Sequence, residues 1–141
     1  MQLLEERIRR EGKIRPGGIL KVDSFLNHQI DPNLLFEMAK ELKRLFGDAG
    51  VTKILTIEAS GIAMASMTAY LFSVPLVFAK KSKSKNISDD VFAVEIPSFT
   101  HGNTNTVVVS REYLHPGDRV LLIDDFLATG AALVGLKALV E

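Results

Sequence analysis

The sequence predicts a single-domain α/β protein over residues 1–141, with a twisted, mainly parallel sheet flanked by helices. An apolar run at 53–57, a stretch rich in alanine and methionine at 62–72 and a second apolar run at 76–79 are typical of strand, helix and strand. A strand–helix–strand unit implies parallel strands and a right-handed crossover. The apolar run at 119–123 predicts a further buried strand, again followed by a helical pattern.

The composition is that of an ordinary soluble globular domain. Apolar residues make up 47% and charged residues 24% of the chain, which excludes a disordered protein. The chain has no cysteine, which excludes disulfides, cysteine–zinc sites and a thiol nucleophile. Its three histidines are far apart, at no spacing typical of metal ligands.

The charge pattern and the N-terminus limit the partners and the location. Seventeen basic residues balance seventeen acidic ones, so we expect no general affinity for nucleic acid. No apolar run approaches the ~20 residues that span a bilayer, so we expect no membrane association. The N-terminus, MQLLEERIRREGK, is too charged for a signal peptide, and we therefore expect a cytoplasmic protein.

The first fifty residues predict a charged helix, a loop and an amphipathic helix. Residues 3–11 favour a short charged helix, and residues 14–25 favour a loop with a short extended piece. Asp31 followed by Pro32 is a helix start signal, an N-cap acid with proline at the first helical position. We expect that helix to end near Gly47 or Gly50.

The second half contains a long polar excursion. Residues 80–105 place a strand-like run between polar ends, a pattern that is usually functional or mobile. A strand at 106–110, a turn at 115–118 and the strand at 119–123 follow. The chain ends after one more helix, whereas in an α/β domain such a helix is normally followed by another strand of the sheet. We therefore expect either that a C-terminal segment is missing from this sequence or that the protein is a shortened one.

The segment VLLIDDFLATG at 120–130 carries most of the chemical information. A buried strand delivers Asp124 and Asp125 to its C-terminal end, where ligands bind in open parallel sheets. Two carboxylates suit the neighbouring hydroxyls of a ribose, because each oxygen accepts hydrogen bonds. The alternative is that both acids only serve the turn and the helix cap.

The residues after the acids suit a phosphate. Small side chains leave backbone N–H groups open, Gly130 permits unusual dihedral angles, and the following helix N-terminus favours an anion. Thr129 can add a hydroxyl donor. These features predict a ribose beside a phosphate, held by one strand–loop–helix unit.

Residues 120–130 resemble the phosphoribosyl pyrophosphate signature of type I phosphoribosyltransferases: four apolar residues, two acids, two variable residues and a small–Thr–Gly step. The sequence EASGI at 58–62 resembles the pyrophosphate loop of that family, and residues 80–105 resemble its flexible active-site loop. The segment at 20–32, LKVDSFLNHQIDP, resembles the xanthine branch specifically. The resemblance covers essentially the whole chain.

The resemblance implies a type I phosphoribosyltransferase fold with a flexible active-site loop and, because the chain ends at Glu141, an incomplete hood over the base. It implies transfer of phosphoribosyl from phosphoribosyl pyrophosphate to xanthine in purine salvage, giving xanthosine monophosphate and pyrophosphate. Magnesium would arrive on the pyrophosphate rather than in a fixed protein site. A homodimer is also implied.

The resemblance also assigns roles to individual residues. Asp124 and Asp125 would be the catalytic acids, and Leu20 and Asn27 would contact the purine base, although alone they look like a core residue and a loop cap. The 5′-phosphate would be bound by Ala128, Thr129, Gly130, Ala131 and Ala132. The pyrophosphate would be bound by Ala59, Ser60, Gly61, Lys80 and Lys81, with solvated lysines as the alternative. Glu58 would repel pyrophosphate and is expected to bind backbone amides or a lysine instead.

Two other functions stay open on the sequence. The first is transfer to adenine, or to guanine and hypoxanthine, by the same chemistry. The second is a regulator that keeps this fold only to sense phosphoribosyl pyrophosphate. A receiver domain is excluded because its acid pair follows the first strand, whereas this pair lies at 124–125.

Overall fold

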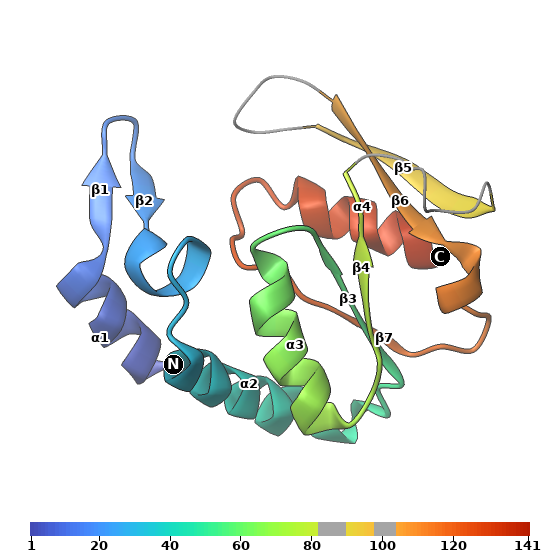
Figure 1. Ribbon diagram of the computed structural model, residues 1–141, viewed down its shortest axis with the longest axis horizontal. Helices are drawn as coiled ribbons and strands as arrows, with labels where there is room; N and C mark the ends of the chain where they lie inside the picture. The colour runs from blue at the N-terminus through green and yellow to red at the C-terminus, as the bar shows by residue number, and fades with distance from the viewer. Residues whose placement is uncertain (82–89, 98–103) are drawn as a thin grey trace.

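The centre of the protein is a three-stranded parallel sheet (Figure 1). A computed structural model describes residues 1–81, 90–97 and 104–141. Strand β3 (Lys53–Ile57) lies between β4 (Leu76–Ala79) and β7 (Val120–Leu122) and is parallel to both. All five residues of β3 are buried, as expected for a central strand covered on both faces. The predicted strand–helix–strand unit is confirmed.

Helices cover both faces of this sheet. Consecutive residues of β3 point to opposite faces, and they join different cores. Ile54 packs in the core that α2 (Pro32–Phe46) and α3 (Gly61–Phe72) share. Leu55 packs in the core that α4 (Ala131–Val140) shares with an antiparallel strand pair. The expected α/β architecture is therefore confirmed.

The strand expected at 106–110 forms, but it pairs antiparallel. β6 (Thr104–Ser110) runs against β5 (Val91–Pro97), which is the strand-like run inside the polar excursion. Lys80 at the end of β4 exchanges two backbone hydrogen bonds of 2.9 Å with Val108, and these join the pair to the parallel sheet. The rest of the expected active-site loop, at 82–89 and 98–103, lies outside the described residues.

A glycine fits α4 against β5. A Cβ atom on Gly135 would lie 2.3 Å from Cδ1 of Ile96, far too close for two carbon atoms. Gly135 therefore lets the helix approach the strand pair, and this contact fixes the position of the α4 N-terminus. Because α4 follows the acidic segment directly, its packing also positions that segment.

The N-terminal part forms a separate layer beside α2 (Figure 1). Helix α1 (Gln2–Glu11) precedes a hairpin of β1 (Lys13–Arg15) and β2 (Ile19–Lys21). The short turn between the strands uses Gly17 and Gly18, whose φ angles of 86° and 74° favour glycine. A π-helical turn, η1 (Asp23–Asn27), then buries Phe25 and Leu26 in the core that α2 and α3 share.

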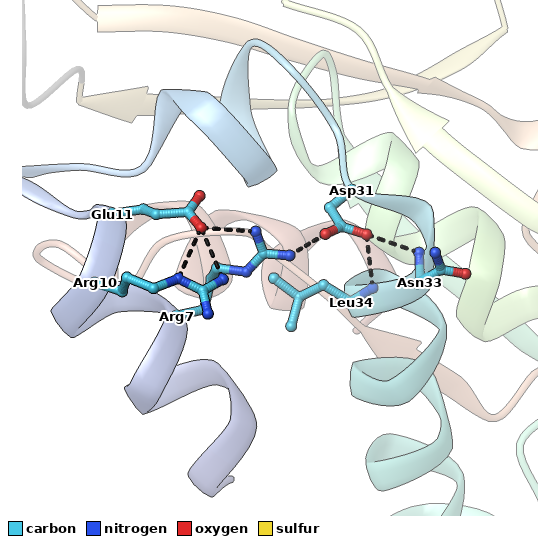
Figure 2. A network of polar contacts seen from close by, with 6 residues as sticks. All are labelled: Arg7, Arg10, Glu11, Asp31, Asn33 and Leu34. Carbon is cyan, nitrogen blue, oxygen red and sulfur yellow. Dashed lines mark hydrogen bonds and ion pairs between the residues drawn. The ribbon is translucent and has the colours of Figure 1, made fainter.

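The network in Figure 2 ties this layer to the start of α2. The side chain of Asp31 accepts hydrogen bonds from the backbone N–H groups of Asn33 and Leu34, at 3.0 and 3.2 Å, which confirms the predicted N-cap. Its other oxygen pairs with Arg7 of α1, which also contacts Glu11 at 3.0 Å. The Leu34 amide first, and the Arg7 charge as well, lower the pKa of Asp31.

The end of the sheet where β3 begins is held by an ion pair between the buried Lys53 and the partly buried Asp118. Lys53 at the start of β3 contacts Asp118 at 2.7 Å, and Asp118 also accepts a hydrogen bond of 2.8 Å from the N–H of His115. This closes the predicted turn at 115–118 just before β7. Short 3-10 turns, η2 (Gly47–Ala49) and η3 (Arg111–Tyr113), complete the connections. None of the helices formed by the described residues has the length and apolar character that crossing a bilayer requires.

Candidate active site

A cavity of about 240 Å³ lies where the carboxyl ends of β3 and β7 meet the N-terminus of α4. Ligands bind at this edge in open parallel sheets. The cavity is lined by most of the residues predicted to bind sugar, phosphate and pyrophosphate: Ser60, Lys81, Asp124, Asp125, Ala128, Thr129, Gly130, Ala131 and Ala132. Segments that are far apart in the sequence therefore share one site.

The acid pair lies at the end of β7, as predicted. The N–H of Ile123 donates to the carbonyl of Leu55 over 2.9 Å, so the strand pairing continues up to the acids. The N–H of Asp125 donates to Oδ1 of Asp124 over 3.0 Å. Both carboxylates thereby reach the cavity, although consecutive strand residues would point to opposite faces.

The pKa of Asp124 is raised above its ordinary value. Burial raises the pKa of Asp124 to about 6, and the side chain of Asp125 adds to this through hydrogen bonding and like charge. The positive charge of Lys81 acts in the opposite direction. A carboxyl group with this pKa is poised to change its charge close to neutral pH.

Asn27 is brought to the acid pair from the N-terminal layer. Its Nδ2 donates a hydrogen bond of 2.9 Å to Oδ2 of Asp125. Leu20 is half-buried and packs against the core beneath η1. Neither Leu20 nor Asn27 lines the cavity itself, but the contact to Asp125 sets the segment at 20–32 beside it.

The loop at 128–132 offers backbone donors to the cavity. Gly130 has φ 81° and ψ −3°, a left-handed conformation that turns the chain into α4. The first N–H groups of a helix have no partner within the helix, and they carry its positive dipole end. The N–H of Ala131 donates to Oγ1 of Thr129 over a long 3.4 Å. The loop is therefore suited to an anion such as phosphate.

The connection after β3 is anchored by Glu58. Its N–H donates to the carbonyl of Ala79, and its Oε1 accepts a hydrogen bond of 2.8 Å from the N–H of Lys81. The prediction that Glu58 binds a backbone amide is confirmed. Ser60 reaches the cavity, whereas Ala59 and Gly61, on either side of it, do not line it. The peptide bond between Glu58 and Ala59 is cis.

The two candidate lysines diverge. Lys81 lines the cavity, whereas Lys80 lines a second cavity of about 640 Å³ between β4 and β6. Adjacent residues at the end of an extended strand point to opposite sides, which explains the split. Of the two, Lys81 is the one placed to meet an anion in the first cavity.

The strand pair adds cavity residues that the sequence patterns did not indicate. Ile96, Asn105 and Val107 also line the cavity. Their strands could be predicted, but no pattern in the chain showed which face they would turn towards the site. Phe126 and Leu127, at the two variable positions of the signature, also line the cavity.

The carboxylate oxygens at the cavity are of the kind that a hard cation such as magnesium prefers. Among the described residues, no three His, Cys, Asp or Glu side chains gather to hold a metal ion. Magnesium favours oxygen ligands and keeps several waters, so carboxylates near a phosphate pocket fit an ion that is carried by the substrate's own oxygens.

The fold and this cavity define a type I phosphoribosyltransferase, and the chain belongs to the phosphoribosyltransferase family. The family model of the phosphoribosyl transferase domain matches residues 22–141. A xanthine phosphoribosyltransferase of Lachnoclostridium phytofermentans is 60% identical over 140 residues, which are 99% of this chain and 72% of that protein. One from Lactobacillus delbrueckii subsp. bulgaricus is 53% identical over 141 residues, which are 100% of this chain and 75% of that protein.

Solved structures agree on the fold. An adenine phosphoribosyltransferase from Giardia lamblia in complex with 9-deazaadenine superposes with a TM-score of 0.76 at 26% identity, over 93% of this chain and 72% of that one. The adenine phosphoribosyltransferase of Rhodothermus marinus gives a TM-score of 0.78 at 24% identity, over 99% of this chain and 79% of that one.

Proposed function

We propose that the protein is a purine salvage enzyme that transfers the phosphoribosyl group of phosphoribosyl pyrophosphate to xanthine, giving xanthosine 5′-monophosphate and pyrophosphate. The observation that carries the proposal is the single cavity lined by Asp124, Asp125 and the loop at 128–132. The identity of 60% to a xanthine phosphoribosyltransferase supports xanthine as the base.

The acid pair and the phosphate loop hold the sugar. Asp124 and Asp125 accept hydrogen bonds from the ribose hydroxyls, and the amides of Ala128–Ala132 with the Thr129 hydroxyl bind the 5′-phosphate. The reaction displaces pyrophosphate from the anomeric carbon by a purine nitrogen, and the sugar becomes cationic in the transition state. Negative charge on the acid pair stabilises that cation, an electrostatic effect that requires little reorganisation.

The leaving pyrophosphate is met by the segments after β3 and β4. The amides of Ala59, Ser60 and Gly61 and the charge of Lys81 neutralise the developing negative charge, and Lys81 has the supporting position at the cavity wall. Lys80 can contact the pyrophosphate only if its side chain turns away from the second cavity. Magnesium, carried by pyrophosphate oxygens and water, supplies further charge neutralisation when bound.

The base lies against the N-terminal layer. Leu20 offers an apolar side chain for a flat purine face, and Asn27 offers both a donor and an acceptor for an oxopurine edge. The contact of Asn27 with Asp125 supports this arrangement, because it sets the predicted base contact next to the predicted ribose contact.

Turnover measured side by side with xanthine, guanine, hypoxanthine and adenine tests the proposal. We expect xanthine to give the highest kcat/KM; preference for adenine would contradict the assignment of the base. Binding of phosphoribosyl pyrophosphate without turnover of any of the four would favour a sensing regulator instead.

We also propose a cytoplasmic homodimer. For the dimer, Phe78 and Tyr113 line the second cavity with exposed fractions of 41% and 52%, and such aromatic surface suits a protein partner. Scattering at micromolar concentration tests the assembly, and a stable monomer would contradict it.

A further inference from the structure

Thr56 carries a buried hydroxyl group without a hydrogen-bond partner. The residue lies in β3, its side chain is 0% exposed, and its Oγ1 has no partner among the described residues. Buried polar groups in native proteins are nearly always paired, so an unpaired one calls for an explanation. Thr68 shows the ordinary case, because it is equally buried and its hydroxyl donates to the carbonyl of Met64 over 2.9 Å.

The unpaired hydroxyl lies beside the acid pair. A Cβ atom on Gly61 would lie 2.3 Å from Oγ1 of Thr56 and 3.6 Å from Oδ1 of Asp124, so both oxygens border the space that the glycine leaves empty. Any side chain at position 61 would occupy that space. The glycine therefore leaves the Thr56 hydroxyl and the Asp124 carboxylate on two sides of the same small volume.

We propose that Thr56 is a positioning residue, whose hydroxyl donates a hydrogen bond to Asp124 when phosphoribosyl pyrophosphate occupies the site. The inference rests on the proposed function. Gly61 belongs to the segment that would turn its amides to the pyrophosphate, and the space beside this glycine is bordered by both oxygens. The hydroxyl then gains the partner that it lacks in the free protein.

The charges around Asp124 explain why such a donor matters. Asp125 and Glu58 are the acids that face the same cavity, and Lys81 is the described cation there. Asp124 already accepts the N–H of Asp125 at 3.0 Å, and a second donor would hold its carboxylate ionised and oriented towards the ribose. The competing explanation is that Thr56 only fills a strand position, which valine fills equally well.

Two substitutions separate these explanations. Thr56→Val keeps the shape but removes the hydroxyl, whereas Thr56→Ser keeps the hydroxyl. We expect Thr56→Val to raise Tm by about 3 °C, because it removes an unpaired buried donor. We expect it to lower kcat/KM for phosphoribosyl pyrophosphate by about tenfold while KM for xanthine stays unchanged. Thr56→Ser should retain kcat/KM within about twofold of the wild-type value.

The outcomes are distinct. Unchanged kcat/KM in Thr56→Val would overturn the proposal, and so would a lowered Tm, which would show that the hydroxyl supports the fold. Thr68→Val is the matched control, because it removes a buried hydroxyl away from the cavity and should leave kcat/KM unchanged. If the wild-type protein turns over neither xanthine nor guanine, hypoxanthine or adenine, the proposed function itself is wrong. An active wild type with an equally active Thr56→Val variant refutes the role of Thr56 alone.

Discussion

The side-chain amide of Asn27 donates a hydrogen bond of 2.9 Å to Oδ2 of Asp125, a residue 98 positions further along the chain. This contact joins the turn η1 of the N-terminal layer to the carboxyl end of β7. Phe25 and Leu26 of the same turn are buried in the core, so the Asn27 side chain is presented from a firmly packed segment.

Replacing Asn27 by aspartate should disrupt this junction. The new carboxylate would face Asp125, and repulsion between like charges would replace the hydrogen bond. We expect KM for xanthine to rise by about tenfold or more, the factor that corresponds to 1.36 kcal/mol. Steady-state kinetics at varied xanthine measures this. Asn33→Asp is the control, because it adds the same charge in the first turn of α2, where negative charge is favourable.

Asp124 should make the protein less stable as the pH rises towards neutral. Its folded pKa of about 6 lies above the ordinary value of 3.8, so the folded state binds this proton more tightly. Stability from this group is present at acid pH and is lost as the pH rises between those two values. Asp124→Asn should therefore have a higher Tm than the wild type at neutral pH, and the difference should vanish in acid. Thermal melts over a pH series measure it, and a constant difference would contradict the pKa.

Breaking the pair of Lys53 and Asp118 should have a large effect on the free energy of unfolding. Lys53 is 8% exposed, and its Nζ contacts both Asp118 and the carbonyl of Tyr113, at 2.7 and 2.6 Å. Removing one partner of a fully buried pair typically costs about 3–5 kcal/mol, because the other charge stays buried alone. Asp118 is 18% exposed and keeps part of its hydration, so we expect Lys53→Met to cost less than this range but more than an exposed pair in chemical denaturation.

The exposed pair of Lys40 and Glu37 provides the matched control for that measurement. Its distance of 2.8 Å is similar to the 2.7 Å of the first pair, but the two side chains are 53% and 44% exposed. Exposed pairs contribute about 0–1 kcal/mol, so Lys40→Met should have little effect. Equal losses in Lys53→Met and Lys40→Met would show that burial of the Lys53 pair is unimportant.

The contribution of Asp118 to stability depends on pH, and the sign of this dependence is definite. Hydrogen bonding to Lys53 lowers the pKa of Asp118, so its stabilisation is present at neutral pH and is lost in acid.

Local patterns predicted the elements that are marked by an apolar run or by cap chemistry. The strands at 53–57 and 76–79 and the N-cap of α2 at Asp31 are correct to the residue, because apolar runs and cap chemistry act locally. The hairpin of β1 and β2 was predicted only as a loop with an extended piece. Its strands have three residues each and are largely exposed, so no hydrophobic period marks them.

Long-range geometry could not be predicted in the same way. The residues at 106–110 indicate a strand, but not that its partner is β5 or that the pairing is antiparallel. Lys80 and Lys81 are equivalent by sequence, and only the strand's alternation places Lys81 alone at the cavity. The contact between Asn27 and Asp125 depends on how the N-terminal layer packs, which no local signal contains.

The acid pair provides the most direct test of the proposed mechanism. The double variant Asp124→Asn, Asp125→Asn keeps the shape of both side chains and some hydrogen bonding, but removes their negative charge. A hydrogen bond to a charged acceptor is worth about 1.5–3 kcal/mol, against about 0.5–1.5 for a neutral one. Losing that difference as the sugar becomes cationic should lower kcat by about tenfold or more and weaken the binding of phosphoribosyl pyrophosphate.

The double variant should still fold, because both acids lie at the cavity and burial already opposes the charge of Asp124. Circular dichroism and thermal melts check this before kinetics are compared. Glu37→Gln with Glu41→Gln is the control, since it removes the same charge from α2, away from the cavity, and should leave kcat unchanged. Full activity in the folded double variant would mean that Asp124 and Asp125 only shape the turn, and that the sugar is held by other groups.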